Sequence, residues 1–277
     1  MSPPLRREVA GLAVEHHHPD GPGPALVVVP GAMDRAAGFR RMVRHLGDRE
    51  VLAYDRRGYG GSLALGAADD LVVHAADLAA VCDAVARPVV VVGHSQGGLI
   101  ALTAAAGRLV PELVGLVVWE PPTPWEPGYD GSGALLDEAD DPGAVAERFL
   151  RTVLGERLWD RVPERTKAER RAEGPALVAD LRSSRRPGAA PDLAAVGVPT
   201  LVGRGSESGP HHRRAAEVVA TGVADGHLVE VAGVGHGPHL SAPAAFADFV
   251  LDADTWIATR RAELDRRPGP GPVPGSP

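Results

Sequence analysis

The sequence predicts an α/β protein, and two features of the chain support this fold class. Short runs of β-branched and other apolar residues, each too short for a helix, recur between stretches of helical periodicity. One such run, Val89–Val92, ends in a glycine-rich turn that opens into an Ala- and Leu-rich helical pattern. The chain of 277 residues is 44% hydrophobic. This is enough for one sizeable core, or for a core with a small appended subdomain.

Composition restricts the classes of protein that remain. The formal net charge of -7 and the pI near 5.9 argue against a binder of nucleic acid or of anionic membranes. The one cysteine, Cys82, excludes an intramolecular disulfide and a metal site with several thiolates. Because Cys82 falls within an apolar helical pattern, we expect a buried structural thiol rather than a nucleophile.

Targeting and membrane signals are not evident in the sequence. No apolar stretch approaches the length of a transmembrane helix. The first seven residues are not followed by the apolar region of a secretory signal. We therefore expect a soluble cytoplasmic protein, and the sequence leaves its oligomeric state open.

The first two predicted strands flank a run of three histidines. Residues 8–15 alternate well enough to be a strand, and 25–29 have the composition of a buried strand. Between them lies His16-His17-His18. Neighbours in an extended segment point to opposite faces, so these three side chains cannot all reach one metal ion. We expect a solvated loop there.

The elements that follow alternate between helix and strand. After Pro30-Gly31-Ala32-Met33, an amphipathic stretch covers 37–46 and a short strand covers 50–54. A glycine-rich loop, Asp55-Arg56-Arg57-Gly58-Tyr59-Gly60-Gly61-Ser62, then leads into a predicted helix over 69–86.

Ser95 occupies the apex of the turn Gly93-His94-Ser95-Gln96-Gly97. In so tight a strand-to-helix turn the apex residue is forced into a strained conformation, and the two glycines let strand and helix close on each other. The serine hydroxyl then lies at a helix N-terminus, where developing negative charge is stabilised. The alternative is a serine in an ordinary glycine-rich turn.

Glu120 ends the next predicted strand, 113–119, and two prolines follow it. A carboxylate at the carboxyl end of a buried strand lies at the edge of an α/β sheet where ligands bind. The alternative is a carboxylate that simply faces water.

Residues 123–190 differ in character from the rest of the chain. Pro/Gly turns separate short helical patterns such as 143–154 and 175–184, with no convincing strand. We interpret its arginines as a solvated face rather than as an anion site. They are Arg165, Arg170, Arg171, Arg182, Arg185 and Arg186.

The C-terminal part returns to strand and helix. A strand near 198–205 precedes His211-His212, which we expect at the exposed start of a helix. After a strand over 227–232, a small glycine-flanked loop carries His236, and His239 begins the next helix near the pocket rim or in water. The Pro/Gly-rich segment 266–277 is expected to be disordered.

Taken together, these motifs resemble the α/β-hydrolase family. That resemblance implies a mostly parallel central sheet with helices on both faces and a small helical cap. The core would be formed by 1–122 and 191–265, and the cap by 123–190. It also implies a nucleophile elbow at Ser95, a catalytic histidine at His236 and an oxyanion hole made by the backbone N–H groups of Ala32 and Gln96.

The acid of the predicted catalytic triad departs from the family's commonest pattern. Many members carry Gly-x-x-Asp after the strand near 200, but the corresponding position here is Ser208. Glu207 is one residue away, and a one-residue slip at a strand end redirects a side chain. Some family members carry the acid one strand earlier, so we favour Glu120 over Glu207. We do not nominate Asp55 as the acid, because it precedes Ser95, whereas the family order is serine, acid, histidine.

The resemblance implies a serine esterase or lactonase that acts on a small molecule through an acyl-enzyme, with no metal or redox cofactor. We expect Met33, His94 and Trp119 to contact the substrate. A serine at the apex argues against displacement at a saturated carbon, for which relatives use an aspartate. Acyl transfer, carbon–carbon bond hydrolysis and perhydrolysis with the same triad remain open. So does a protein that binds a small molecule without catalysis.

Overall fold

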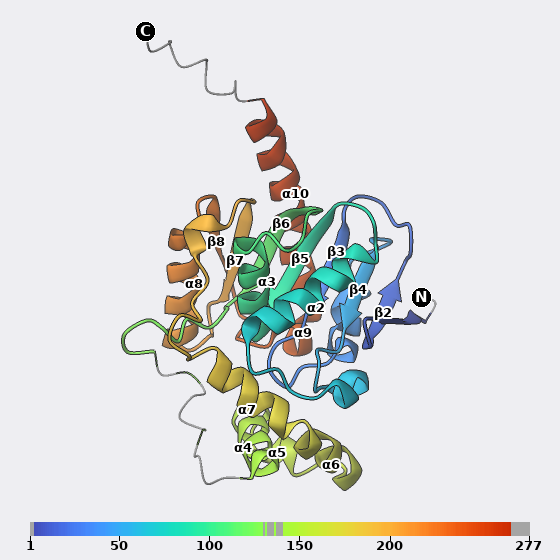
Figure 1. Ribbon diagram of the computed structural model, residues 1–277, viewed down its shortest axis with the longest axis vertical. Coiled ribbons are helices and arrows are strands. Elements are labelled where there is room, and N and C mark those ends of the chain that lie inside the picture. The colour runs from blue at the N-terminus through green and yellow to red at the C-terminus, as the bar shows by residue number, and fades with distance from the viewer. Residues whose placement is uncertain (1–2, 130, 132–135, 137–140, 267–277) are drawn as a thin grey trace.

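An eight-stranded sheet forms the centre of the computed structural model, which describes residues 3–129, 131, 136 and 141–266 (Figure 1). The strands are β1 (Leu5–Val9), β2 (Leu12–His17), β3 (Ala25–Val29), β4 (Val51–Tyr54), β5 (Val89–His94), β6 (Leu113–Trp119), β7 (Thr200–Gly205) and β8 (Gly226–Val231). Their order is β1-β2-β4-β3-β5-β6-β7-β8, antiparallel from β1 to β4 and parallel from there on. The predicted α/β class and mostly parallel sheet are confirmed.

Both faces of the sheet are covered by helices, because successive side chains of each strand point to opposite faces. In β3, Ala25, Val27 and Val29 belong to one hydrophobic cluster, while Leu26 and Val28 belong to another. The first cluster includes residues of α2 (Leu71–Asp83), α3 (Gln96–Ala106) and α8 (Pro210–Gly222). The second includes residues of η1 (Ala36–Phe39), α1 (Arg40–Val43) and α10 (Pro243–Asp265). Cys82 of α2 is buried, as predicted.

The register of the parallel strands brings their carboxyl ends to one edge of the sheet. Val29 pairs with Gly93, His94 with Trp119, and Trp119 with Gly203. The loops that follow β3, β5, β6 and β7 therefore meet at this edge, where ligands bind in open α/β sheets.

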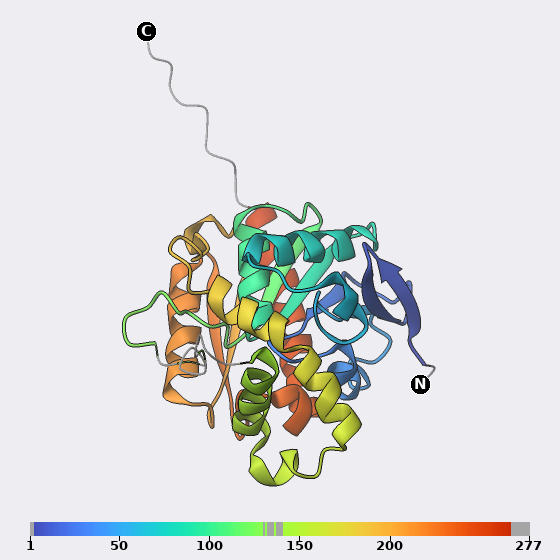
Figure 2. The same cartoon turned by 60° about the horizontal axis from the view of Figure 1, so that its bottom comes forward.

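Among the described residues between β6 and β7, four α-helices lie together beyond one end of the strands, below the sheet in Figure 1 and in front of it in Figure 2. They are α4 (Pro142–Leu154), α5 (Glu156–Trp159), α6 (Glu164–Ala172) and α7 (Gly174–Ser183). Their apolar side chains, among them Val145, Trp159 and Leu177, form a third hydrophobic cluster together with Met33 and Tyr59 of the core loops. We refer to these four helices as the cap helices. The boundaries at 123 and 190 stay a prediction.

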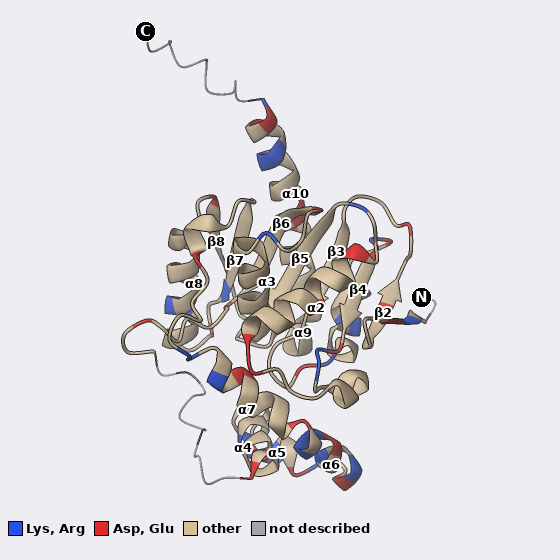
Figure 3. Ribbon diagram, viewed as in Figure 1, with Lys and Arg blue, Asp and Glu red and all other residues tan. Residues whose placement is uncertain are grey.

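The arginines of the cap helices lie among carboxylates, and Figure 3 shows acidic and basic residues interleaved along α6. Arg165 is exposed and pairs with Glu169. Arg170 pairs with Glu173, and Arg171 pairs with Glu147. The expected solvated face holds for Arg165, whereas Arg170 is only partly exposed and donates to the Met33 carbonyl of a core loop.

Two expectations for the N-terminal region are wrong. Residues 8–15 are not one strand but span a hairpin, because Ala10 (φ 51°) and Gly11 (φ 81°) form a two-residue turn between β1 and β2. The predicted solvated loop at the three histidines is also incorrect, since His16 and His17 belong to β2 and are each 5% exposed. The buried His16 ring has a polar partner, because its Nε2 lies 2.7 Å from a carboxylate oxygen of Glu50.

Apart from Arg266, the predicted disordered segment 266–277 lies outside the described residues. In the part of the chain that the structure describes, no helix has the length and apolar character needed to cross a membrane.

A buried carboxylate, Asp180 of α7, joins the cap helices to the core. Arg56 donates to both of its oxygens at 3.0 and 2.7 Å, and the Tyr59 hydroxyl donates at 2.6 Å. Nε2 of His74 lies 3.1 Å away. Burial alone would raise the pKa of Asp180, but Arg56 and His74 hold it below its usual value. The carboxylate is therefore ionised at neutral pH and is paired.

Replacing this carboxylate should destabilise the protein. Asp180→Ala leaves Arg56 as a buried charge without its partner, and such losses cost about 3–5 kcal/mol of unfolding free energy. Chemical denaturation of the variant and of the wild type measures the difference. Arg165→Ala, which removes an exposed cation from the same cap helices, is the control. A loss for Asp180→Ala no larger than that of the control would contradict the expectation.

Candidate active site

Ser95 lies in a strained turn between β5 and α3. Its φ is 50° and its ψ is -119°, in a region that residues with a side chain rarely adopt. A Cβ on Gly97 would lie 2.0 Å from the Val29 carbonyl oxygen, and one on Gly93 would lie 2.6 Å from the Gly98 Cα. The turn is held by the Ser95 N–H, which donates to the Trp119 carbonyl at 2.8 Å. Backbone contacts with neighbouring strands thus fix the serine at the edge of the sheet.

Glu120 and His236 are brought together from 116 positions apart. Glu120 is fully buried directly after β6, and its φ is 45°. One carboxylate oxygen accepts the Gly205 N–H at 2.8 Å, and the other lies 2.7 Å from Nδ1 of His236. Because the buried carboxylate accepts, Nδ1 carries the proton and Nε2 offers a lone pair.

Glu207 does not take part in this pairing. It is exposed, and no side-chain interaction in the described part of the chain joins it to His236. Ser208 is buried, and its hydroxyl has no partner among the described residues. The geometry favours Glu120, and the role of the acid stays a prediction.

The two predicted oxyanion donors come from different elements, one from α3 and one from the loop after β3. Gln96 is the first residue of α3, so its N–H is one of those that a helix leaves without an internal acceptor. Ala32 lies in the loop after β3, next to Met33, whose φ is 61°. Their role in binding an oxyanion remains a prediction.

The ring of His212 lies against His236, which corrects the expectation that His212 is exposed. The ring of His212 stacks on His236 at 3.7 Å between centroids, and His211 lies 3.9 Å from His212. His212 is therefore not at an exposed helix start. Its pKa is lowered to about 2, first by burial and then by the neighbouring His236. Of the two positions expected for His239, water is wrong, because His239 is 1% exposed. Its ring lies 4.6 Å from that of His94, between centroids.

The three residues expected to contact substrate have different positions. Met33 packs against the cap helices and stays a candidate. Trp119 lies in the core, edge-to-face with Phe246 and Phe249, so substrate contact by Trp119 was a wrong expectation. His94 is buried, at 5% exposure, and both of its ring nitrogens have partners within the protein, so neither nitrogen is free for a substrate.

A metal ion does not fit the stacked histidines well. Donor atoms of Glu120, His212 and His236 lie within 4.8 Å of one another. The two rings are nearly parallel, at 10°, so their in-plane lone pairs do not converge on one point. Nδ1 of His236 is also engaged with Glu120. These residues fit proton transfer better than metal ligation.

The comparisons with known proteins agree with the fold described above. Residues 26–249 match the Alpha/beta hydrolase family. Among solved structures, an esterase from Exiguobacterium antarcticum is 20% identical and has a TM-score of 0.69, with 91% of this chain and 99% of that chain covered. No curated protein matches the sequence significantly.

Two other solved structures show how varied the similar proteins are. An N-acyl homoserine lactone degrading enzyme is 20% identical, with a TM-score of 0.67 and coverage of 90% and 99% of the two chains. A bromoperoxidase from Bacillus anthracis is 18% identical, with a TM-score of 0.65 and coverage of 92% and 100%. The fold and the match along most of the chain define the class, and the protein belongs to the alpha/beta hydrolase family.

The acid can be tested by removing one charge at a time. Glu120→Gln should lower kcat by about three to four orders of magnitude, because the neutral amide neither fixes the tautomer of His236 nor stabilises its imidazolium. Glu207→Gln is the matched control and should change kcat little. Hydrolysis of p-nitrophenyl acetate provides the measurement. A large loss in Glu207→Gln with an active Glu120→Gln would overturn the assignment.

The rate should also persist at acidic pH. Burial, followed by the positive charge of His94, lowers the pKa of His236 well below its ordinary value of 6.5. A general base acts only in its neutral form, so a lowered pKa keeps the base functional below pH 6.5. The acid limb of kcat/KM against pH should therefore lie below 6.5. A limb at or above that value would contradict this reading.

Proposed function

We propose that the protein is a serine hydrolase that cleaves a carboxylic ester or a lactone of a small molecule through an acyl-enzyme on Ser95. The observation that carries the proposal is the buried Glu120 carboxylate at 2.7 Å from Nδ1 of His236. This pair lies at the same sheet edge as the strained Ser95 turn. Fold relatives described as an esterase and as a lactone-degrading enzyme support the same class of reaction.

In the first half of the proposed reaction, Ser95 Oγ attacks the carbonyl carbon of the substrate. Nε2 of His236 takes the hydroxyl proton, while Glu120 stabilises the resulting imidazolium. The carbonyl oxygen becomes an oxyanion, which the N–H groups of Ala32 and Gln96 would stabilise. The tetrahedral intermediate then expels the alcohol oxygen, which receives the proton from His236. The products of this step are an acyl-enzyme and the free alcohol.

In the second half, water replaces the alcohol. His236 takes a proton from the water as the water oxygen attacks the acyl carbon, and the oxyanion forms again. Collapse of this intermediate breaks the bond to Ser95 Oγ, which regains its proton from His236. A carboxylic acid leaves. With a lactone, acid and alcohol remain parts of one molecule.

An active-site label tests the nucleophile without knowledge of the substrate. A small fluorophosphonate should add to the wild type once per chain, because Ser95 Oγ displaces fluoride from phosphorus when His236 accepts its proton. Intact-mass spectrometry measures the adduct. Ser95→Ala, checked for folding by circular dichroism, should show none. A folded wild type without an adduct, or an equal adduct on Ser95→Ala, would contradict the proposal.

A further inference from the structure

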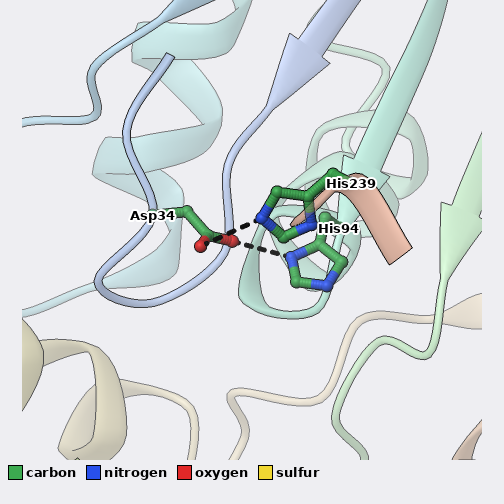
Figure 4. Close-up of side chains that lie close together, drawn as sticks. All are labelled: Asp34, His94 and His239. Carbon is green, nitrogen blue, oxygen red and sulfur yellow. Dashed lines mark hydrogen bonds and ion pairs between the residues drawn. The ribbon is translucent and has the colours of Figure 1, made fainter. Parts of the chain in front are cut away.

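Asp34, His94 and His239 form a cluster beside the candidate triad that the proposed reaction does not use (Figure 4). Their side chains are 18%, 6% and 2% exposed. Asp34 follows β3, His94 directly precedes Ser95, and His239 belongs to α9 (Pro238–Ser241). Each oxygen of Asp34 faces one histidine: Oδ2 lies 2.8 Å from Nδ1 of His94, and Oδ1 lies 3.4 Å from Nε2 of His239.

Both ring nitrogens of His94 face hydrogen-bond acceptors. Nδ1 faces the Asp34 carboxylate, and Nε2 lies 2.7 Å from the backbone carbonyl oxygen of His236. A carbonyl oxygen can only accept, and a neutral imidazole donates from one nitrogen alone. Burial alone would raise the pKa of Asp34, but His239 and His94 hold it well below its ordinary value, so Asp34 is a carboxylate that can only accept. With Asp34 ionised, both contacts are satisfied only if His94 is an imidazolium. Burial alone would lower the pKa of His94, but Asp34 and the His236 carbonyl raise it above its ordinary value.

The resulting ion pair connects three loops of the candidate site. Asp34 Oδ2 also accepts the Gly31 N–H at 3.2 Å, within the loop that carries Ala32. A Cβ on Gly31 would lie 2.9 Å from both Asp34 Oδ2 and Nδ1 of His94. The loop can therefore approach the pair only because residue 31 is glycine. On its other side, His94 holds the backbone of His236.

We infer that Asp34 and a doubly protonated His94 form a positioning ion pair. The pair holds the loop that carries Ala32, the Ser95 turn and the His236 loop in fixed positions relative to one another. The positioning role rests on the proposed serine chemistry, whereas the protonation state of His94 does not. The pair also places a fixed positive charge close to His236, at 5.0 Å between ring centroids. That charge opposes protonation of the base. The titratable groups that face His94 are Asp34, His236, His239, Glu120 and His212.

The same three residues are a less suitable site for a metal ion. Two histidines and one carboxylate are a common metal-ligand set, but Nδ1 of His94 and Oδ2 of Asp34 already lie at hydrogen-bond distance from each other. The Phe39 ring also stacks on His239 at 4.3 Å. A proton on Nδ1 of His94 that is donated to Oδ2 of Asp34 accounts for the 2.8 Å separation without a metal ion.

Nitrogen NMR on the whole protein tests the protonation state directly. Protein labelled with ¹⁵N-histidine should show both ring nitrogens of His94 in the protonated form at about pH 7, above the ordinary imidazole pKa of about 6.5. The signals are assigned by their absence in His94→Gln. His45→Gln, which removes an exposed histidine, should leave these signals unchanged. In Asp34→Asn, His94 should become neutral. A neutral His94 in the wild type would overturn the inference.

Kinetics test the positioning role. His94→Gln and Asp34→Asn should each lower kcat for p-nitrophenyl acetate about tenfold to hundredfold with little change in KM, because misplaced groups lower the rate more than binding. Since the two residues act as a unit, the double variant should lose no more than the worse single variant. His94→Gln should also move the acid limb of the pH profile upward. The positioning role would be contradicted if the losses of kcat in the two single variants multiplied in the double variant, or if the acid limb of the pH profile did not move in His94→Gln.

The design separates this inference from the proposed function. If the wild type does not react with a fluorophosphonate, the proposed serine chemistry is excluded, and the positioning role is excluded with it, whatever NMR shows of His94. If the wild type reacts, and His94→Gln and Asp34→Asn react at the same rate as the wild type, only the positioning role is excluded. If His94→Gln does not fold, the His94 signals of the wild type can be assigned through its backbone resonances instead. Asp34→Asn then serves as the variant in both the NMR and the kinetic test. Inhibition by added Zn²⁺ that disappears in Asp34→Asn would assign the cluster to a metal instead.

Discussion

The site depends on how closely β5 and α3 approach each other around Ser95. No side chain fits at Gly97, where a Cβ would be 2.0 Å from the Val29 carbonyl oxygen. The close approach forces Ser95 into a positive φ and so fixes which way its neighbours point. His94 is turned into the protein, where it meets Asp34, and the N–H of Gln96 begins the helix. One steric constraint therefore orders three consecutive residues.

Backbone strain recurs where strands end at this edge. Met33, Ser95 and Glu120 each have a positive φ, of 61°, 50° and 45°. Such conformations cost about 1–3 kcal/mol each and persist only when the surroundings determine them. Here the surroundings are hydrogen bonds from other strands: Ser95 N–H donates to Trp119, and Glu120 N–H donates to the Gly203 carbonyl at 3.1 Å. The parallel sheet thus stabilises the strained turns that follow its strands.

The sequence predicts those parts of the fold that depend on local pattern. β3 begins and ends at the predicted residues, because an apolar run bounded by turn residues is a local signal. The burial of His16 was missed because it depends on Glu50, 34 positions away. For the same reason Asp34 did not stand out, although it meets His94 over 60 positions. A polar residue reveals its role only when the fold supplies its partner.

The loop after β3 is held from two directions, which links the cap helices to the predicted oxyanion donors. On the core side, Asp34 meets His94. On the other side, Arg170 of α6 donates to the Met33 carbonyl at 3.1 Å, and Arg35 pairs at 2.7 Å with Glu173, which is fully buried. A shift of α6 would therefore pull on the loop that carries Ala32. In the proposed reaction, a movement of α6 would therefore reach the predicted oxyanion donor Ala32 through the Met33 carbonyl and the Arg35–Glu173 ion pair, without any cap residue contacting the substrate carbonyl.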